Sequence, residues 1–286
     1  MWLLMAVGSA VFAGATAILA KIGIRNTDSN LATALRTVVV LVFSWILVFV
    51  SGAQQGLRGL SGENVLFLVL SGLGTGASWI CYFRALQLGN VNKVTPIDKS
   101  STVLTMILAF IFLGEGISAP KLIGMVFIGA GTLFMIRKKE NVENSSEKKG
   151  WLLFAFLSAV FASLTAILGK IGVQGMDSNL GTAIRTIVVL MMAWIIVFVQ
   201  KKQSQIRKID LKSWIFLMLS GITTGLSWLC YYRALQDGDA SIVVPVDKLS
   251  IVVTVAFSFL FLKEKISKVQ FAGLIAIVCG TFLLLI

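Results

Sequence analysis

The chain has 286 residues, of which 57% are hydrophobic and 13% are charged, and its mean hydropathy is +0.91. This composition is too apolar for a soluble domain. The net charge of +12 does not indicate a nucleic-acid partner, because the basic residues lie mainly at the ends of apolar runs, where membrane proteins carry their topology signals. The chain has no histidine, and its three cysteines lie in or near apolar runs. We therefore expect no disulfide framework, no metal or other cofactor and no enzymatic activity.

The chain contains one sequence unit written twice. Residues 2–137 align without a gap with residues 151–286 at an offset of 149, and about half of the aligned residues are identical. Self-similarity of this length fixes the architecture before any local feature is considered. We expect a first five-helix repeat over 1–137, a polar basic linker over 138–150 and a second five-helix repeat over 151–286.

Apolar runs of about 20 residues, the length that crosses a bilayer, recur along both repeats. In the first repeat we expect spans at 2–22, 31–51, 65–84, 94–113 and 120–136. In the second we expect them at 151–171, 180–200, 213–233, 243–262 and 269–286. The run at 2–22 is not interpreted as a signal peptide, because it lacks a basic start and its copy lies in mid-chain. The predicted fold is an all-α polytopic membrane protein with ten transmembrane helices.

An odd number of spans per repeat predicts that the two repeats have inverted topology. Ten of the 25 Lys and Arg residues are matched between the repeats, which leaves fifteen with orientation information. Lys121 falls on one predicted side of the membrane. The other fourteen fall on the opposite side: Arg25, Lys93, Arg137, Lys138, Lys139, Lys148, Lys149, Lys201, Lys202, Lys208, Lys212, Lys263, Lys265 and Lys268. By the positive-inside rule the basic loops are cytoplasmic, so we expect both termini outside a plasma or inner membrane.

Ionisable residues recur within or at the ends of the spans of both repeats. They are Lys21 and Lys170, Arg36 and Arg185, Arg84 and Arg233, Asp98 and Asp247, and Lys99 and Lys248. Charges at this depth are costly and mark transport pathways, although long Lys and Arg side chains at span ends also reach the interface by snorkelling. Snorkelling suits Lys21, Arg84 and their copies. Arg36 lies deeper, about 9 Å into its span, and both interpretations remain open for it.

Aspartate is too short to snorkel, so Asp98 is the strongest candidate for a gate. Asp98, Ser101 and Thr105 share one helical face, and Asp247, Ser250 and Thr254 repeat it. We expect Pro96 and Pro245 in the first turn of this helix. A capping role, or a pair with Lys99 and Lys248, is the structural alternative. Because the repeats are inverted, we expect Asp98 with a basic neighbour to close an inner gate and Asp247 an outer one.

Aromatic and small residues supply further candidates. Trp79 and Tyr82, repeated as Trp228 and Tyr231, fit either an interfacial belt or a substrate wall. G-x-x-x-G pairs predict close helix packing at Gly72, Gly76, Gly221 and Gly225. The Asp28-Ser29-Asn30 segment predicts a helix N-cap. Glu115 and Glu264 follow the fourth spans, where we expect exposed loop carboxylates.

Four motifs resemble the EamA-type drug/metabolite transporter superfamily, and most closely its small five-span bacterial members. They are SNLATALRT at 29–37, SWICYFRALQLG at 78–89, PIDKSS at 96–101 and FLGE at 112–115. The resemblance covers both repeats and implies a ten-helix transporter of small metabolites. Many ten-span relatives are described with cytoplasmic termini, whereas the charges here predict the opposite.

The functional prediction is a secondary transporter, an exporter of a small polar metabolite such as an amino-acid-like zwitterion or an organic anion. No phosphate-binding G-x-x-x-x-G-K-[ST] is present, so we do not expect ATP as the driver; protons are the candidate coupling ion. A flippase for a lipid-linked substrate and a cationic drug exporter are the alternatives. Because one chain already carries both repeats, a monomer suffices, and a homodimer remains the other possibility.

Overall fold

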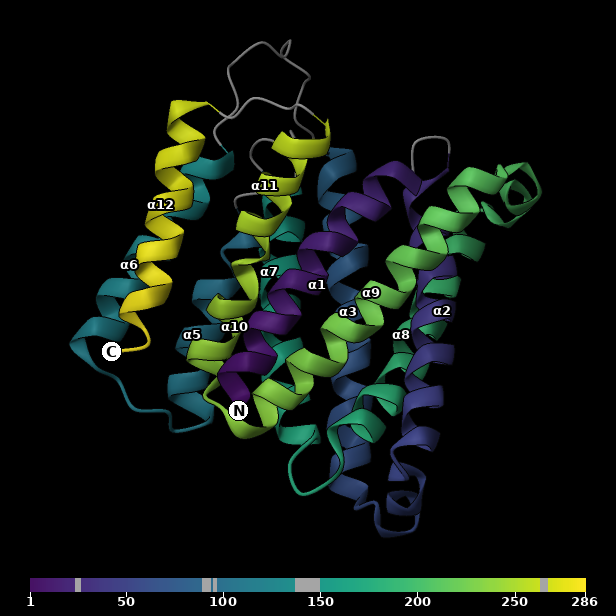
Figure 1. Ribbon diagram of the computed structural model, residues 1–286, viewed down its shortest axis with the longest axis horizontal. Helices are drawn as coiled ribbons and strands as arrows, with labels where there is room; N and C mark the ends of the chain where they lie inside the picture. Colours follow the sequence, from purple (N-terminus) through teal and green to yellow (C-terminus); the bar gives the residue numbers. More distant parts are fainter. Residues whose placement is uncertain (24–26, 89–93, 95–96, 137–149, 263–266) are drawn as a thin grey trace. The chain divides into compact units, whose positions relative to one another are not determined.

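The computed structural model describes residues 1–23, 27–88, 94, 97–136, 150–262 and 267–286 (Figure 1). Throughout this part of the chain the regular structure is helical and contains no strand. The α-helices are α1 (Trp2–Gly23), α2 (Ser29–Val50), α3 (Gly62–Leu88), α5 (Ser101–Phe112), α6 (Ala119–Ile136), α7 (Trp151–Gly172), α8 (Ser178–Val199), α9 (Leu211–Asp237), α10 (Ala240–Lys248), α11 (Ser250–Leu262) and α12 (Lys268–Leu283). Two 3₁₀ segments, η1 (Ala53–Gly59) and η2 (Gln203–Lys208), follow α2 and α8.

Six of these helices are long and apolar enough to cross a membrane: α1, α2, α3, α7, α8 and α9. Shorter apolar helices lie at Ala119–Met135 and Lys268–Leu283. The prediction of an all-α membrane protein is therefore confirmed, whereas the number of ten crossings stays a prediction.

The fourth span of the second repeat is not one helix, so the expected helix over 243–262 is wrong. The chain forms α10, a break at Leu249 and then α11. The Leu249 amide bonds to the carbonyl of Val246, three residues back instead of four. Pro245 lies inside α10 and not in a first turn, and its ring nitrogen has no hydrogen to donate. In the first repeat Pro96 lies outside the described residues.

The break recurs at the matching place in the first repeat. Residues 97–99 are helical, Ser100 forms a turn, and α5 begins at Ser101. The Ser100 amide bonds to the carbonyl of Ile97 at 3.2 Å, again three residues back. Interrupted helices are a recurring feature of binding sites in secondary transporters.

The described helices form two compact units, and each unit contains parts of both repeats. The first comprises Met1–Leu73, Leu168–Gly238 and Ser250–Lys263, and the second comprises Gly74–Ile167, Asp239–Leu249 and Glu264–Ile286. The chain passes from the second unit to the first at the break after Leu249.

In the first unit α2 packs against α8, its own copy in the other repeat. The side-chain amide of Asn30, near the start of α2, donates to Gln200 Oε1 beyond the end of α8 at 2.6 Å. Val48, near the end of α2, packs with Leu180 and Ala183 near the start of α8. These contacts show that the two copies of this helix run in opposite directions.

Helix ends and close contacts in this unit follow the sequence signals. Asp28 caps α2 by accepting from the amides of Asn30 and Leu31, as expected. A Cβ built on Gly72 would lie 2.7 Å from Val188 Cβ, and one built on Gly221 would lie 2.7 Å from Val39 Cβ. Glycine therefore lets α3 approach α8 and lets α9 approach α2 more closely than any other residue could. Gly225 lies against Phe43 in the same way, and Gly76 is buried.

In the second unit α6 packs against its copy α12, also in opposite directions (Figure 1). A Cβ built on Gly124 would lie 2.6 Å from the Gly280 carbonyl oxygen, and one on Gly131 would lie 2.6 Å from that of Gly273. This contact between α6 and α12 was not predicted from the sequence. The sequence did contain an indication of it, because each fifth span carries a pair of glycines seven residues apart.

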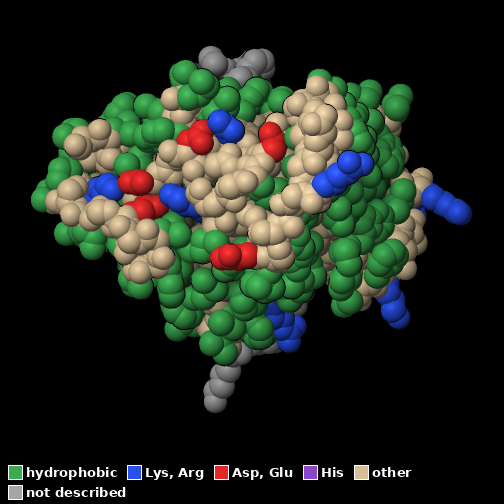
Figure 2. Space-filling model, turned by 90° about the horizontal axis from the view of Figure 1, so that it is seen from below, with side chains coloured by type: hydrophobic (Ala, Val, Ile, Leu, Met, Phe, Trp, Pro, Cys, Tyr) green, Lys and Arg blue, Asp and Glu red, His purple; other side chains and the backbone are tan. Residues whose placement is uncertain are grey.

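The outer helix faces carry large apolar side chains. On α2 the exposed residues Val38, Val42, Ile46 and Phe49 recur about every four residues. Their copies on α8, Ile187, Met191, Ile195 and Phe198, are exposed as well. Figure 2 shows hydrophobic side chains over much of the visible surface. Such continuous apolar faces suit contact with lipid and not with water.

Candidate functional site

Arg185 is a charged residue buried inside a membrane-spanning helix. It belongs to α8, and 3% of its surface is exposed. Its Nε donates to Ser71 Oγ of α3 at 2.9 Å. Its guanidinium carbon lies 5.2 Å from the centre of the Trp228 ring and 4.9 Å from that of Tyr232, both on α9. Both distances are within the range of cation–π attraction, so two neighbouring helices hold this cation in place.

Arg36 of α2 is the copy of Arg185 and has a more open environment. It is partly buried, and its Nη2 donates to Thr224 Oγ1 of α9 at 2.8 Å. The Thr224 hydroxyl in turn donates to the Ser220 carbonyl, which leaves its oxygen free to accept. Arg36 Nε is buried and has no hydrogen-bond partner among the described residues.

The two arginines lie at different depths of the α2–α8 pair. Each is seven residues into its helix, which corresponds to about 10 Å at 1.5 Å per residue. Because the helices are antiparallel, these positions lie in opposite halves of the pair. Neither arginine lies at a helix end, and the choice between a pathway role and snorkelling stays a prediction for Arg36.

Asp98 accepts a hydrogen bond from a serine of a neighbouring helix in the second unit, and that serine is itself bonded to another. Ser158 Oγ of α7 donates to Asp98 Oδ1 at 2.7 Å, and Ser78 Oγ of α3 donates to the Ser158 carbonyl at 3.0 Å. Lys99 Nζ lies 3.9 Å from Asp98 Oδ2, and the Asp98 side chain is 17% exposed. Ser78 and Ser158 were not predicted as site residues, although both recur in the other repeat, as Ser227 and Ser9.

Asp247 lies in the last turn of α10, directly before the break. Lys248 Nζ is 3.8 Å from Asp247 Oδ2, and 15% of the Asp247 side chain is exposed. The pairing of each aspartate with the next lysine, considered above as a structural alternative, is therefore present in both repeats. Thr105 and Thr254 donate to the carbonyls of Ser101 and Ser250 within their own helices, at 2.8 and 2.9 Å.

The remaining predicted residues have separate environments. Trp79 is partly buried, and Tyr82 packs against the cluster of Ala85, Val94 and Ala155. Tyr231 meets Tyr232 edge to face at 5.3 Å. Lys170 Nζ donates to the Gly238 carbonyl at 2.7 Å, whereas the side chain of its copy Lys21 lies outside the described part of the chain.

Glu115 corrects the expectation of an exposed loop carboxylate. Its Oε1 accepts from the Ala240 amide at 2.6 Å and its Oε2 from the Ser241 amide at 2.8 Å, so it binds the N-terminus of α10. Its copy Glu264 lies outside the described residues. The FLGE motif was the available signal, but nothing local to it indicated a partner 125 residues away.

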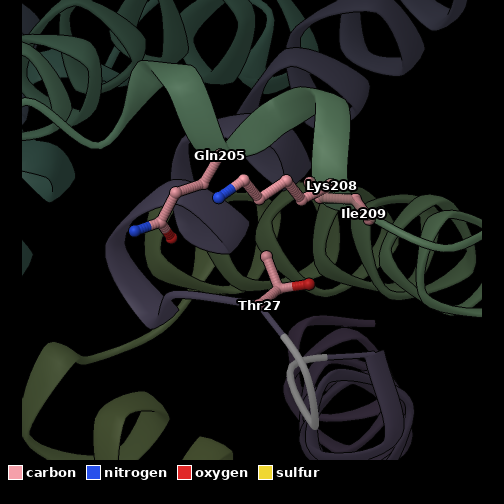
Figure 3. A pocket seen from close by; sticks show the side chains of 4 residues that line it. All are labelled: Thr27, Gln205, Lys208 and Ile209. Atoms are coloured by element: carbon pink, nitrogen blue, oxygen red, sulfur yellow. The ribbon is translucent and has the colours of Figure 1, made fainter.

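A small polar pocket in the first unit is lined by Thr27, Gln205, Lys208 and Ile209, with a volume of about 180 Å³ (Figure 3). It contains none of the predicted site residues. In the described part of the chain, no group of three or more Cys, Asp or Glu residues could hold a metal ion.

Fold and site together define a multi-pass helical membrane protein with charged residues inside its spans. The model of the EamA-like transporter family matches residues 1–137 and 149–286, so the chain belongs to this family. An uncharacterized transporter of Sinorhizobium sp, from the cobO 3′ region, is 44% identical over 134 residues, which cover 47% of this chain and 95% of that protein. That relative therefore has about the length of one repeat.

Other relatives match the whole chain. An uncharacterized transporter of Archaeoglobus fulgidus is 25% identical and covers 99% of this chain and 98% of its own length. The uncharacterized transporter YyaM of Bacillus subtilis is 26% identical over 97% of this chain and 91% of its own length. A solved crystal structure has a similar fold, with a TM-score of 0.76, 17% identity and coverage of 97% of this chain and 94% of its own.

Proposed function

We propose that this protein is a secondary transporter that exports a small metabolite carrying a carboxylate, as an amino-acid-like zwitterion or an organic anion. The observation that carries the proposal is the pair Arg36 and Arg185 inside antiparallel membrane helices. A cation near the middle of a span costs about 2.5–3.5 kcal/mol or more. The described hydrogen-bond partner of Arg36 is the Thr224 hydroxyl, which offsets this cost only in part.

A carboxylate suits such a site because guanidinium groups bind it through two parallel hydrogen bonds. Arg36 offers Nε as a further donor beside the Nη2 that Thr224 engages. A cationic drug would be repelled by the same charges. The geometry therefore favours an anionic or zwitterionic cargo over the drug-cation alternative.

The proposed mechanism is alternating access between inverted repeats. The antiparallel packing of α2 with α8 and of α6 with α12 supports opposite orientations for the two repeats. With the basic loops in the cytoplasm, Asp98 and Lys99 lie toward the inner side and Asp247 and Lys248 toward the outer side. Equivalent groups on opposite sides then form the two gates.

Transport by purified protein in liposomes tests the cargo. We expect uptake or counterflow of amino acids or organic anions, and none of quaternary amines. Arg36→Gln should abolish this flux, whereas Arg58→Gln, which removes an exposed charge from η1, should leave it unchanged. Lipid scrambling without flux of any solute would contradict the proposal and favour a flippase.

Neutralising the two aspartates tests the gates. We expect Asp98→Asn and Asp247→Asn to bias the protein toward opposite-facing states, because each removes the charge that Lys99 or Lys248 pairs with. Cysteine accessibility from the two sides of sealed vesicles measures the bias. Glu63→Gln, at an exposed position of α3, is the control for charge removal. Identical shifts from both aspartate variants would contradict the assignment.

A further inference from the structure

The N-terminus of α10 is capped from a distance and not by its own N-cap residue. The Glu115 carboxylate, in the segment between α5 and α6, accepts from the amides of Ala240 and Ser241 at 2.6 and 2.8 Å. Glu115 and α10 both belong to the second unit. A helix begins with amides that lack partners within the helix, and a carboxylate there is also favoured by the helix dipole. This contact ties α10 to the segment that precedes α6.

The residue that would ordinarily cap α10 is Asp239, and it is turned elsewhere. Asp239 Oδ2 lies 3.3 Å from Lys121 Nζ of α6. Among the described residues its side chain makes no hydrogen bond to the amides of α10. Elsewhere in the chain the aspartates that precede helices do cap them: Asp28 caps α2, Asp177 caps α8 and Asp210 caps α9. Asp239 is thus a competent cap that is engaged by another partner.

We propose that these residues form a latch that opens by exchange of helix caps, a proposal that rests on the alternating access proposed above. In the closed latch Glu115 caps α10 and Asp239 pairs with Lys121. When the latch opens, Asp239 turns back to cap its own helix while Glu115 and Lys121 become hydrated. The Ser241 amide keeps an acceptor in both states, while the Ala240 amide is hydrated together with Glu115 and Lys121, so opening costs less than a complete loss of the cap.

The ion pair of the latch, Asp239 with Lys121, has no charged counterpart in the other repeat. Lys121 is the one unmatched basic residue on the predicted outer side, and the repeat places Gln270 at its counterpart and Asn90 at that of Asp239. Gln270 instead completes a capping box with Ser267 at the start of α12. The residues at the matching inner positions, Gln270 and Asn90, are uncharged and therefore cannot form such an ion pair. We infer that the latch controls the outer gate.

Movement of α10 would be transmitted along the chain. This helix has nine residues and ends directly before the break at Leu249, where the chain enters the other unit. The latch therefore holds the first residues of α10, and the last two residues of the same helix are Asp247 and Lys248.

A thiol introduced at Ser241 reports on the latch. Ser241 is fully buried, so Ser241→Cys, made after replacing Cys81, Cys230 and Cys279 by alanine, should react slowly with a membrane-impermeant thiol reagent. We expect Glu115→Ala to raise the labelling rate about tenfold, because two charge-assisted hydrogen bonds of the closed state are lost. Labelling needs no substrate, so this outcome is independent of the cargo. Equal rates with and without Glu115 would overturn the latch.

A matched pair of variants separates cap exchange from a simple ion-pair latch. Asp239→Asn and Asp239→Ala both remove the pair with Lys121, but only asparagine can cap a helix. Cap exchange predicts that the thiol of Ser241→Cys reacts about fivefold faster when combined with Asp239→Asn than with Asp239→Ala, because only asparagine stabilises the open state. Equal rates in the two combinations would overturn the exchange. Ala119→Cys, at an exposed position of α6, should react at one rate in all backgrounds and controls for reagent access.

Discussion

Arg36 and Arg185 occupy the same position of the repeated unit but have different surroundings. Arg185 is enclosed by Ser71 and two aromatic rings, with 3% of its surface exposed. Arg36 is partly buried, and Thr224 is its described hydrogen-bond partner. The sequences also differ here, since Tyr232 in the second repeat corresponds to Phe83 in the first.

The difference between Arg36 and Arg185 indicates how a duplicated site can work in transport. Two identical groups at opposite depths of one antiparallel helix pair need not be engaged at the same time. In the conformation described here Arg185 is enclosed by Ser71 and two aromatic rings, whereas Arg36 is the more exposed of the two. We therefore expect Arg36 to be the group that meets substrate in this state and Arg185 to take that role in the opposite state.

The largest effect is expected from removing either guanidinium. Arg36→Gln and Arg185→Gln should each lower the transport rate at low substrate concentration by about 100-fold or more, since a hydrogen-bonded charge contact is worth roughly 1.5–3 kcal/mol and each arginine would make two such contacts. Arg185→Gln should also lower Tm, because Ser71 and the two rings lose their partner. Flux and Tm of the purified variants measure the two effects.

Lysine substitutions are the control for charge alone. Lysine retains the charge but not the planar fork, so Arg36→Lys should restore only part of the flux. Full transport by a folded Arg185→Gln protein would show that Arg185 has only a structural role. The proposal that Arg36 and Arg185 bind substrate in opposite states would then be wrong.

Helix positions and several helix ends could be predicted from the sequence because they depend on local pattern. Apolar runs of membrane length predicted α1, α2, α7 and α8 to within about two residues, and Asp28 signalled the start of α2. The depth of Arg36 followed from its distance to that cap. These features need no knowledge of which helices meet.

The interruption and the long-range contacts could not be predicted, because they depend on which helices meet. The segment 243–262 has the length of one span, and Pro245 was only a partial signal of the break at Leu249. The cap that Glu115 provides for α10 joins residues 125 positions apart. Nothing in the sequence distinguishes Ser71 and Thr224 from other small polar residues. Only the packing of the helices places each of them beside an arginine.

A smaller effect is expected from the hydroxyls that hold the two arginines. Ser71→Ala removes the acceptor of Arg185 Nε, and Thr224→Val removes that of Arg36 Nη2 at nearly constant volume. Each should reduce transport about tenfold, as a hydrogen bond to a charged group is worth about 1.5 kcal/mol or more. If the comparison holds, Ser71→Ala also lowers Tm more than Thr224→Val, because Arg185 is the more deeply buried group. Equal changes in Tm would contradict that difference.

The smallest effect is expected from Tyr232→Phe, at a position where the two repeats differ in sequence. Its ring lies 4.9 Å from the Arg185 guanidinium, and a cation–π contact is worth about 0.5–2 kcal/mol. Tyr232→Leu should therefore lower transport about twofold to thirtyfold. Tyr232→Phe keeps the ring, restores the residue found at the matching position of the first repeat, and should change transport by less than about twofold. A large loss in Tyr232→Phe would show that the hydroxyl and not the ring distinguishes the Arg185 site, and the comparison would then depend on a hydrogen bond of Tyr232.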